Sequence, residues 1–255
     1  MNRGRTWLLG ASLINLLFLY APIAVLILFS FNASRLSATW QGWTLEWYRR
    51  LAEDEALLAS VRNSLLVGIV STTIATTLGV GAALGMERLS FRRRRIVEGT
   101  MLLPLIIPEI MMGVALMLFF VLIKLPLSLT TVVIGHATFN LPVVMMIVRA
   151  RLRKLDPSLE EAARDLGATS WQAFRRITWP LLMPAVLGAV LMAFTFSLDD
   201  FIVTFFTAGA GSTTLPLRVY SMVKSGVSPV INALSAVMVL ISMALIGMSL
   251  ALQRR

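Results

Sequence analysis

Long apolar stretches alternate with short basic segments along most of the chain. An α-helix needs about 20 consecutive apolar residues to cross the hydrocarbon core of a bilayer, which is roughly 30 Å thick. Six stretches meet this requirement: about Trp7–Phe31, Ala56–Met86, Gly99–Ile123, Leu129–Val148, Leu181–Phe206 and Ile231–Leu252. The pattern therefore predicts an all-α membrane protein with six transmembrane helices that form a single domain over residues 1–255.

Two of these stretches have features of their own. The second is diluted by four threonines between positions 72 and 77 and by glycines, which predicts close packing against other helices. The first follows Arg3 and Arg5, as in a signal peptide. Its apolar run is too long for the h-region of a signal peptide and no A-x-A cleavage site follows it, so we expect an uncleaved helix.

The composition supports a membrane protein and excludes several other classes. Hydrophobic residues make up 57% of the 255 positions and charged residues 14%, and the mean hydropathy is +0.81. A net charge of +10 is also typical of nucleic-acid-binding proteins, but here the basic residues lie in short runs between apolar segments, so we expect a membrane partner and no nucleic acid. The absence of cysteine excludes disulfides and thiolate metal sites, and no metal site is expected.

Lysine and arginine are distributed unevenly between the connecting segments. If the N-terminus lies inside the cell, the inner segments carry 16 of the 23 basic residues and the outer segments 7. An excess of basic residues marks cytoplasmic loops, so both termini are predicted to be cytoplasmic. The run Arg92–Arg95 is expected to anchor this face, with contact to anionic lipid. In the first outer loop, Trp40, Trp43, Trp47 and Tyr48 are predicted to form an interfacial amphipathic turn.

The inner segment 149–180 reads RARLRKLDPSLEEAARDLGATSWQAFRRITWP and predicts two short helices. Asp156 or Ser158 is a candidate cap for the first helix, and Pro157 suits a position in its first turn. Ser158 and Glu161 have the spacing of a capping box. These residues predict where the first short helix begins.

The same segment contains signals for the end of the first helix and the start of the second. Gly167 is predicted to supply the left-handed residue that ends the first helix. Ser170 is a candidate cap for the second helix, which is expected to run towards Pro180 and the fifth apolar stretch. The loop is thus predicted to be a helical hairpin.

The spacing of several residues in this hairpin resembles the EAA motif of ABC importer permeases. The matching residues are Glu161-Ala162-Ala163, Gly167, Ile177 and Pro180, with Trp179 where the motif usually has Leu. In that family this loop is a coupling helix that docks into a groove on the ATP-binding subunit. The resemblance implies this role for segment 149–180 and for Glu161, Ala162, Ala163 and Gly167 within it.

Other stretches resemble the spermidine/putrescine-type permeases of that family, and most closely the second permease of such a system. They are SFNASR, WQGWTLEWY, FTFSLDDFIVTFFTAG and TLPLRVYSMVKSGVSPVINAL. The resemblance implies the type I ABC importer permease fold in a bacterial inner membrane. It also implies a second homologous permease, two ATP-binding subunits and a periplasmic solute-binding protein as partners. Sister importers for aminobutyrate-, opine- or thiamine-like solutes share these stretches, so those substrates remain alternatives.

The chain lacks the phosphate-binding motif G-x-x-x-x-G-K-[ST] and has no Gly-Lys pair. It is therefore not expected to cradle the phosphates of ATP by that route or to be an enzyme. No catalytic residue and no cofactor is assigned to this chain. ATP and Mg²⁺ are expected to bind to the partner subunits.

Three acidic residues fall within the predicted spans: Glu109, Asp199 and Asp200. A charged side chain at the bilayer centre costs about 2.5–3.5 kcal/mol on insertion scales, so such residues usually face a cavity or a partner. Glu109 follows Pro108, which is expected to open the helix beside the path. Carboxylates near aromatic side chains suit a polyamine, and we expect Glu109 and one of the two adjacent aspartates to line the substrate path. A cap or a contact with the second permease is the alternative role.

His136, the only histidine, lies in the fourth stretch, where a hydrogen-bonded packing role is the expected one. Two other function classes remain as alternatives. An intramembrane protease would need two aspartates on separate helices or a serine with a base in reach, and Asp199 and Asp200 are neighbours. A self-contained channel or secondary transporter would leave the hairpin at 149–180 without a role.

Overall fold

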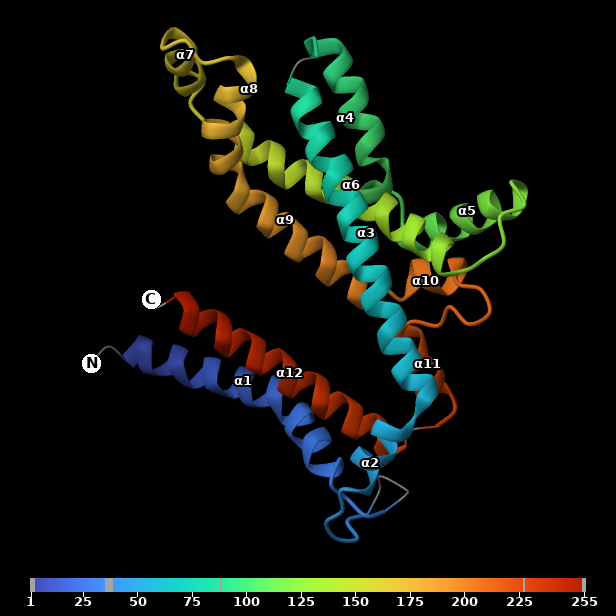
Figure 1. The fold of residues 1–255 in the computed structure, drawn as a ribbon. Helices are drawn as coiled ribbons and strands as arrows, with labels where there is room; N and C mark the ends of the chain where they lie inside the picture. Colours follow the sequence, from blue (N-terminus) through green and yellow to red (C-terminus); the bar gives the residue numbers. More distant parts are fainter. Residues whose placement is uncertain (1–2, 35–38, 88, 227, 254–255) are drawn as a thin grey trace. The chain divides into compact units, whose positions relative to one another are not determined.

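The computed structural model describes residues 3–34, 39–87, 89–226 and 228–253, and α-helices account for most of them (Figure 1). The chain divides into two compact units, one formed by residues 1–58 and 218–255 and the other by residues 59–217. The helices are α1 (Arg3–Phe29), α2 (Glu46–Glu53), α3 (Glu55–Glu87), α4 (Phe91–Ile106), α5 (Glu109–Leu122), α6 (Leu129–Leu152), α7 (Ser158–Asp165), α8 (Ser170–Ala173), a π-helix (Phe174–Thr178), α9 (Trp179–Asp199), α10 (Ile202–Thr207), α11 (Leu215–Lys224) and α12 (Pro229–Gln253).

In the first unit, α1 packs against α12, and α2 packs against α12 as well. Asn32 organises the loop between α1 and α2. Its carbonyl accepts a hydrogen bond of 2.7 Å from Trp47 Nε1, and its side-chain oxygen accepts one of 2.8 Å from the backbone N–H of Gln41. Trp47 is consequently buried, whereas Trp43 is 72% exposed. Only part of the aromatic cluster in this loop is therefore available for the interfacial role predicted for it.

An ion pair in the same unit links the start of α3 to α11. Arg218 Nη2 lies 3.2 Å from Asp54 Oδ2, and Asp54 Oδ1 accepts a hydrogen bond of 2.9 Å from the backbone N–H of Leu57. Burial alone raises the pKa of Asp54, but the N–H of Leu57 and the guanidinium of Arg218 outweigh it and hold the pKa below its usual value. Asp54 thus caps α3 and neutralises a partly buried cation.

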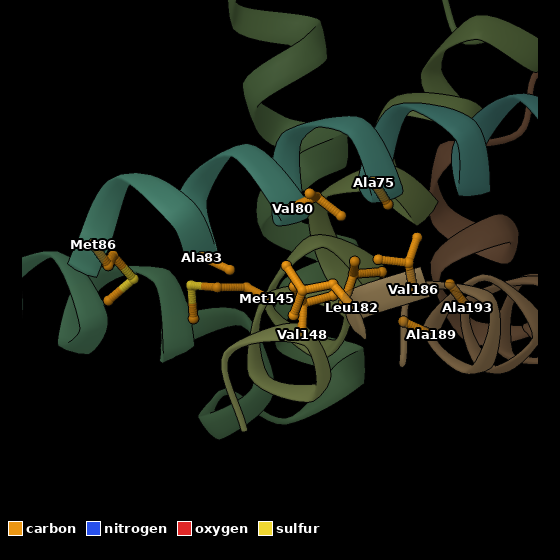
Figure 2. Packing of buried hydrophobic residues seen from close by; sticks show 11 residues of the cluster. Ala75, Val80, Ala83, Met86, Met145, Val148, Leu182, Val186, Ala189 and Ala193 are labelled. Carbon is orange, nitrogen blue, oxygen red and sulfur yellow. The ribbon is translucent and has the colours of Figure 1, made fainter. Parts of the chain in front are cut away.

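The core of the second unit lies where α3, α6 and α9 pack together, with α4 against α6 (Figure 2). Its centre contains Val144 and Val148 of α6 and Leu182 of α9, all with no exposed surface. Gly79 allows α3 to approach closely, because a Cβ atom there would lie 2.9 Å from Cβ of Val144. The close packing predicted from the small residues of this stretch is confirmed.

Four helices among the described residues are long and apolar enough to cross a membrane: Leu9–Phe29, Glu55–Glu87, Leu129–Leu152 and Ser170–Asp199. The pair α4 and α5 adds a fifth if it forms one bent span, and Pro229–Met243 is a shorter apolar helix. The count of six spans and the cytoplasmic termini therefore stay predictions. The basic residues Arg35, Arg88, Arg254 and Arg255, which entered the charge count, lie outside the described residues.

Two of the predicted spans are broken rather than continuous. The third bends by 103° between α4 and α5. Pro108 explains this break, because it pushes Ile107 into an extended conformation (φ −72°, ψ 132°) and α5 starts only afterwards. The fifth ends at Asp199, and the short helix α10 follows after Asp200 and Phe201. Both breaks lie beside the acidic residues expected in the substrate path.

Candidate coupling loop and substrate path

Helix α7, which carries the Glu161-Ala162-Ala163 sequence, begins with a side-chain cap. Asp156 Oδ1 accepts a hydrogen bond of 3.0 Å from the backbone N–H of Ser158, and Pro157 already has helical dihedral angles (φ −60°, ψ −27°). The same N–H group lowers the pKa of Asp156 below its usual value. Asp156 is therefore the cap of the two candidates, whereas Ser158 lies inside the helix, so the capping box predicted for it is wrong.

Gly167 ends α7 as predicted, with φ at +87°. Its backbone N–H donates to the carbonyl of Arg164 at 2.9 Å, and the N–H of Ala168 donates to the carbonyl of Ala163 at 3.0 Å. These two bonds form a Schellman motif, which requires a residue in the left-handed region where glycine carries no steric penalty. The chain reverses at this point and leads into α8.

Helix α8 is capped by Thr169 rather than by Ser170. Thr169 Oγ1 accepts from the backbone N–H of Gln172 at 3.3 Å, and Gln172 Oε1 accepts from the N–H of Thr169 at 2.9 Å. This reciprocal pair is a capping box and makes Ser170 the first helical residue, so the predicted cap is wrong by one position. The helix then continues through the π-helix into α9, as expected from Pro180.

Side-chain contacts between its two arms hold the hairpin together. Glu160 of α7 accepts a hydrogen bond from Thr178 Oγ1 in the π-helix, and within α7 it also lies 3.6 Å from Arg164 Nη2. At the base of the loop, Arg151 Nε donates to the carbonyl of Leu181 at 3.1 Å. The hairpin is thus a preformed structural element.

The matching residues of the motif lie on the outside of this hairpin. Glu161, Ala162 and Gly167 are exposed, and Ala163 is half-buried. Two large apolar side chains stand beside them: Leu166 is 89% exposed and Trp171 67%. Exposed apolar groups rimmed by charge are typical of a protein docking surface.

The three acidic residues of the predicted path come together at the two helix breaks. Glu109 is the first residue of α5, and Asp199 is the last residue of α9; both are exposed. Glu109 begins α5, and Asp199 and Asp200 directly precede Phe201 and the start of α10. The packing of α10 against α5 brings the breaks together. Three carboxylates therefore share one region of the second unit.

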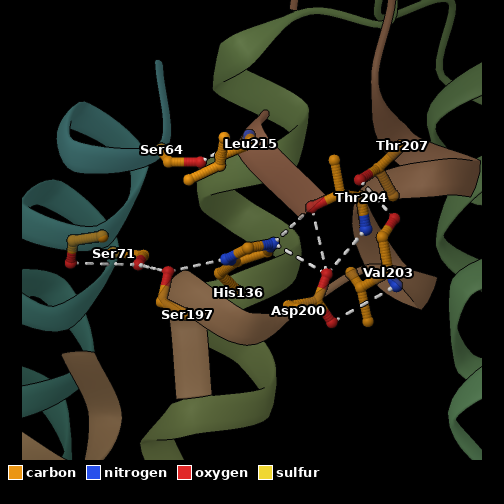
Figure 3. Close-up of polar contacts among 10 residues, drawn as sticks. Ser64, Ser71, His136, Ser197, Asp200, Val203, Thr204, Thr207 and Leu215 are labelled. Atoms are coloured by element: carbon orange, nitrogen blue, oxygen red, sulfur yellow. Dashed lines mark hydrogen bonds and ion pairs between the residues drawn. The ribbon is translucent and has the colours of Figure 1, made fainter. Parts of the chain in front are cut away.

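Asp200 is held in place by a buried polar network that includes the histidine (Figure 3). His136 Nε2 lies 3.1 Å from Asp200 Oδ1 and 2.9 Å from Thr204 Oγ1, and His136 Nδ1 lies 2.7 Å from Ser197 Oγ. Ser197 Oγ lies 3.1 Å from Ser71 Oγ of α3. The histidine is only 3% exposed, in agreement with the packing role predicted for it. Both ring nitrogens of His136 therefore have buried polar partners.

Asp200 also fixes the start of α10. Its Oδ1 accepts a hydrogen bond of 2.8 Å from the backbone N–H of Thr204 and one of 3.0 Å from Thr204 Oγ1. The carboxylate thus occupies the N-terminus of a short helix, where negative charge is stabilised. The carboxylate of Asp200 is therefore bound by these groups, while the side chain of Asp199 is exposed.

The family model described as "Binding-protein-dependent transport system inner membrane component" matches residues 75–255. This match includes the hairpin and all three acidic residues and covers more than half of the chain. The chain is a member of this permease family. Family members are permease subunits of transport systems, so the expected role as a transport subunit is supported at this level.

Two relatives and one solved structure extend the comparison. The permease is 39% identical over 229 residues to the spermidine/putrescine transport system permease protein PotC of Escherichia coli K12, covering 90% of this chain and 87% of the relative. It is 39% identical over 248 residues to the putrescine transport system permease protein PotI of the same organism, covering 94% and 88%. Its fold is similar, with a TM-score of 0.70 and 18% identity, to a chain of a bacterial alginate ABC transporter in complex with an alginate-pentasaccharide-bound periplasmic protein, covering 92% and 89%.

These comparisons confirm the family resemblance and the all-α ABC importer permease fold. The sequence had no signal for the partner of His136, because Asp200 is 64 positions away, in the break between α9 and α10. The sequence analysis also did not predict a docking role for Leu166 and Trp171. A large apolar residue beside a predicted polar turn can nevertheless be recognised in the sequence as a sign of a docking surface. The roles of the motif and path residues stay predictions.

Proposed function

We propose that this permease is the second membrane subunit of an ATP-driven importer of polyamines such as putrescine and spermidine. The observation that carries the proposal is the position of Glu109, Asp199 and Asp200 at two helix breaks that lie where α10 packs against α5, in a chain 39% identical to PotC and PotI. A polyamine is a chain of ammonium groups separated by methylenes. Exposed carboxylates beside aromatic side chains are complementary to it.

In this proposal the two adjacent aspartates have different tasks. Asp199 lies at the C-terminal end of α9, where the helix carbonyls add partial negative charge and favour a cation. Asp200 has its carboxylate occupied by His136 and by the N-terminus of α10. In this proposal Glu109 and Asp199 contact the passing ammonium groups, and Asp200 holds the break between α9 and α10 in shape. The aromatic groups nearby include Phe201 and Phe205, whose ring centroids are 5.6 Å apart.

The hairpin couples this path to ATP hydrolysis in the proposal. Its exposed face at Glu161, Ala162 and Gly167 docks on an ATP-binding subunit, which also binds ATP and Mg²⁺. The hairpin transmits movement between the subunits because its helix caps and the contacts between its two arms already order it. A second permease and a periplasmic binding protein complete the complex in the bacterial inner membrane, and this chain contributes no catalytic group.

The test is uptake by the complete importer reconstituted in liposomes with its binding protein. Radiolabelled putrescine and spermidine are supplied outside, and ATP is enclosed with the ATP-binding subunits. We expect ATP-dependent accumulation of at least one polyamine, and none when the binding protein is omitted. Accumulation of an aminobutyrate-, opine- or thiamine-like solute instead would replace the polyamine assignment but keep the permease role. Accumulation without ATP or partner subunits would indicate a secondary transporter and contradict the proposal.

A further inference from the structure

Arg149 is a buried charged residue that the family motif does not include. It lies in the last turn of α6, three residues before that helix ends, and is only 4% exposed. A buried charge is costly unless it is paired and hydrogen-bonded. The contacts of Arg149 therefore show how its buried charge is compensated.

Arg149 pairs with carboxylates from two other helices. Its Nη1 forms an ion pair with Glu98 Oε1 of α4, and its Nε lies 3.4 Å from Glu87 Oε1 at the end of α3. Arg94 of α4 adds a second cation, 3.7 Å from Glu87 Oε2, and donates hydrogen bonds to the carbonyls of Glu87 and Leu89. We call Arg149, Glu87, Glu98 and Arg94 the ion cluster. It joins the last turn of α6 to the consecutive helices α3 and α4.

The ion cluster lies between the coupling hairpin and the apolar core. Arg149 is the first residue of segment 149–180, and the neighbouring residue Val148 belongs to the buried core with Met86. Figure 1 shows the end of α3, the start of α4 and the α7–α8 hairpin at the same end of the second unit. Movement of the hairpin therefore reaches α6 at the residue that is bound to α3 and α4.

We propose that Arg149, through Glu87 and Glu98, is a positioning residue that makes α3, α4 and α6 move with the coupling hairpin as one body. The apolar core resists separation of these helices, but it does not fix their register, because apolar packing is not directional. The planar guanidinium forms directional bonds with two carboxylates at once and resists sliding as well. This inference rests on the proposed coupling role of the hairpin and does not depend on the identity of the cargo.

One variant removes the proposed link, and a second separates this effect from a loss of stability. Arg149→Met keeps the length and apolar stem of the side chain but leaves Glu98 without its cation. Breaking a buried ion pair in this way is strongly destabilising by itself. Arg149→Met combined with Glu98→Gln also removes the uncompensated carboxylate and should restore normal protein levels. Arg95→Met is the matched control, because Arg95 is an exposed arginine of α4 without an ion pair among the described residues.

The first measurement is the number of putrescine molecules imported per ATP hydrolysed by the reconstituted complex. We expect the double variant to assemble normally and to lose about fivefold or more in this ratio, the lower end of typical coupling effects. The Arg95→Met control should keep the wild-type ratio. A double variant with normal assembly and a wild-type ratio would overturn the proposal, because the ion cluster would then serve only stability.

The second measurement does not need the cargo. The chain has no cysteine, so Ser90→Cys and Asp165→Cys place one spin label on the α3–α4 connection and one at the end of α7. In the otherwise unaltered complex we expect the same distance between the labels with and without ATP. In the Arg149→Met, Glu98→Gln background we expect ATP to change or broaden it. An ATP-dependent distance without the Arg149 change, or an ATP-independent one with it, would contradict movement as one body. If putrescine is not carried at all, the cargo assignment fails, and this distance still decides the role of Arg149.

Discussion

The coupling hairpin and the polar network around His136 are both well ordered, but they are built in opposite ways. In the hairpin, the bonds that end and start helices join residues two to five positions apart, as from Asp156 to Ser158 and from Thr169 to Gln172. In the network, His136 reaches Ser197 and Thr204 across 61 and 68 positions. The caps and the turn of the hairpin depend on neighbours in the sequence, whereas the network exists only once α3, α6, α9 and α10 have packed.

This difference corresponds to a division of work in the proposed function. A part that docks on another subunit benefits from being shaped before it meets its partner, because less ordering is then required on binding. A part that holds charges inside the membrane needs the assembled helices, because the surrounding hydrocarbon offers no hydrogen bonds. Substitutions should therefore act locally in the hairpin and across several helices in the network.

The largest effect is expected from Gly167→Pro in the hairpin. Proline fixes φ near about −65°, and Gly167 requires +87°. The Schellman motif would be lost and α8 redirected, while the membrane helices stay in place. We expect normal insertion and ATPase activity that is no longer accompanied by uptake.

Gly167→Asn is the matched control for this change. Asparagine tolerates the left-handed region better than other residues with a side chain, so most of the coupling should remain. Glu161→Lys tests the docking face independently, because it reverses an exposed charge without changing the turn. Normal uptake by Gly167→Pro or by Glu161→Lys would show that the hairpin is not the coupling element.

The next largest effect is expected at the exposed carboxylates of the path. Asp199→Asn and Glu109→Gln preserve shape and remove charge. Each should reduce uptake of a polyamine about ten- to hundredfold, because a hydrogen bond to a charged group contributes about 1.5–3 kcal/mol. Initial uptake rates at normal protein levels measure this effect. Wild-type rates for both variants would remove the main support for a cationic cargo.

The variant Asp200→Asn tests whether Asp199 and Asp200 have different roles. An amide still accepts hydrogen bonds from the N-terminus of α10, but it loses the negative charge opposite His136. We expect a lower unfolding temperature together with a smaller loss of uptake than for Asp199→Asn. The reverse order would mean that Asp200 is the aspartate that contacts the cargo.

A smaller effect, on stability alone, is expected from His136→Leu. The substitution removes one partner each from the hydroxyl of Ser197 and the carboxylate of Asp200, which keep their contacts with Ser71 and Thr204. A lost hydrogen bond costs about 0.5–1.5 kcal/mol, and about 1.5–3 kcal/mol where one partner is charged, so the free energy of unfolding should fall by a few kcal/mol. Thermal unfolding in detergent measures this loss. Unchanged stability would show that the network contributes little to the packing of the helices.

The same contrast explains how far the sequence predicted the structure. Asp156 as a cap and Gly167 as a helix end followed from local rules, and the cap at Ser170 was wrong by only one position. The break after Ile106 was signalled by Pro108, although its angle was not. The pairing of His136 with Asp200 and of Arg149 with Glu98 could not be predicted, because it depends on how distant helices pack. The sequence predicted a path role for all three acids, which stays a prediction, but it did not indicate that the carboxylate of Asp200 is already bound by His136 and Thr204.

The smallest effect is expected at Asp54, where a local and a distant contact meet in one side chain. Asp54 Oδ1 caps α3 through Leu57, and Asp54 Oδ2 pairs with Arg218, which is 164 positions away. The pKa of Asp54 is depressed in the folded chain, so the ionised form stabilises the fold at pH values above about 3.9, the usual value for an unfolded chain. This stability is lost as the pH falls through the lower folded pKa.

Arg218→Met removes the distant contact only and should cost less than about 1 kcal/mol at pH 7, because the pair is partly exposed. Asp54→Asn should cost about the same, since asparagine also caps helices, and Asp54→Ala should cost about 1 kcal/mol more. Unfolding temperatures at pH 7 and at pH 3 measure both contributions. The cost of Arg218→Met should shrink at pH 3, and a cost that stays constant would show that Arg218 acts through packing rather than through the charge of Asp54.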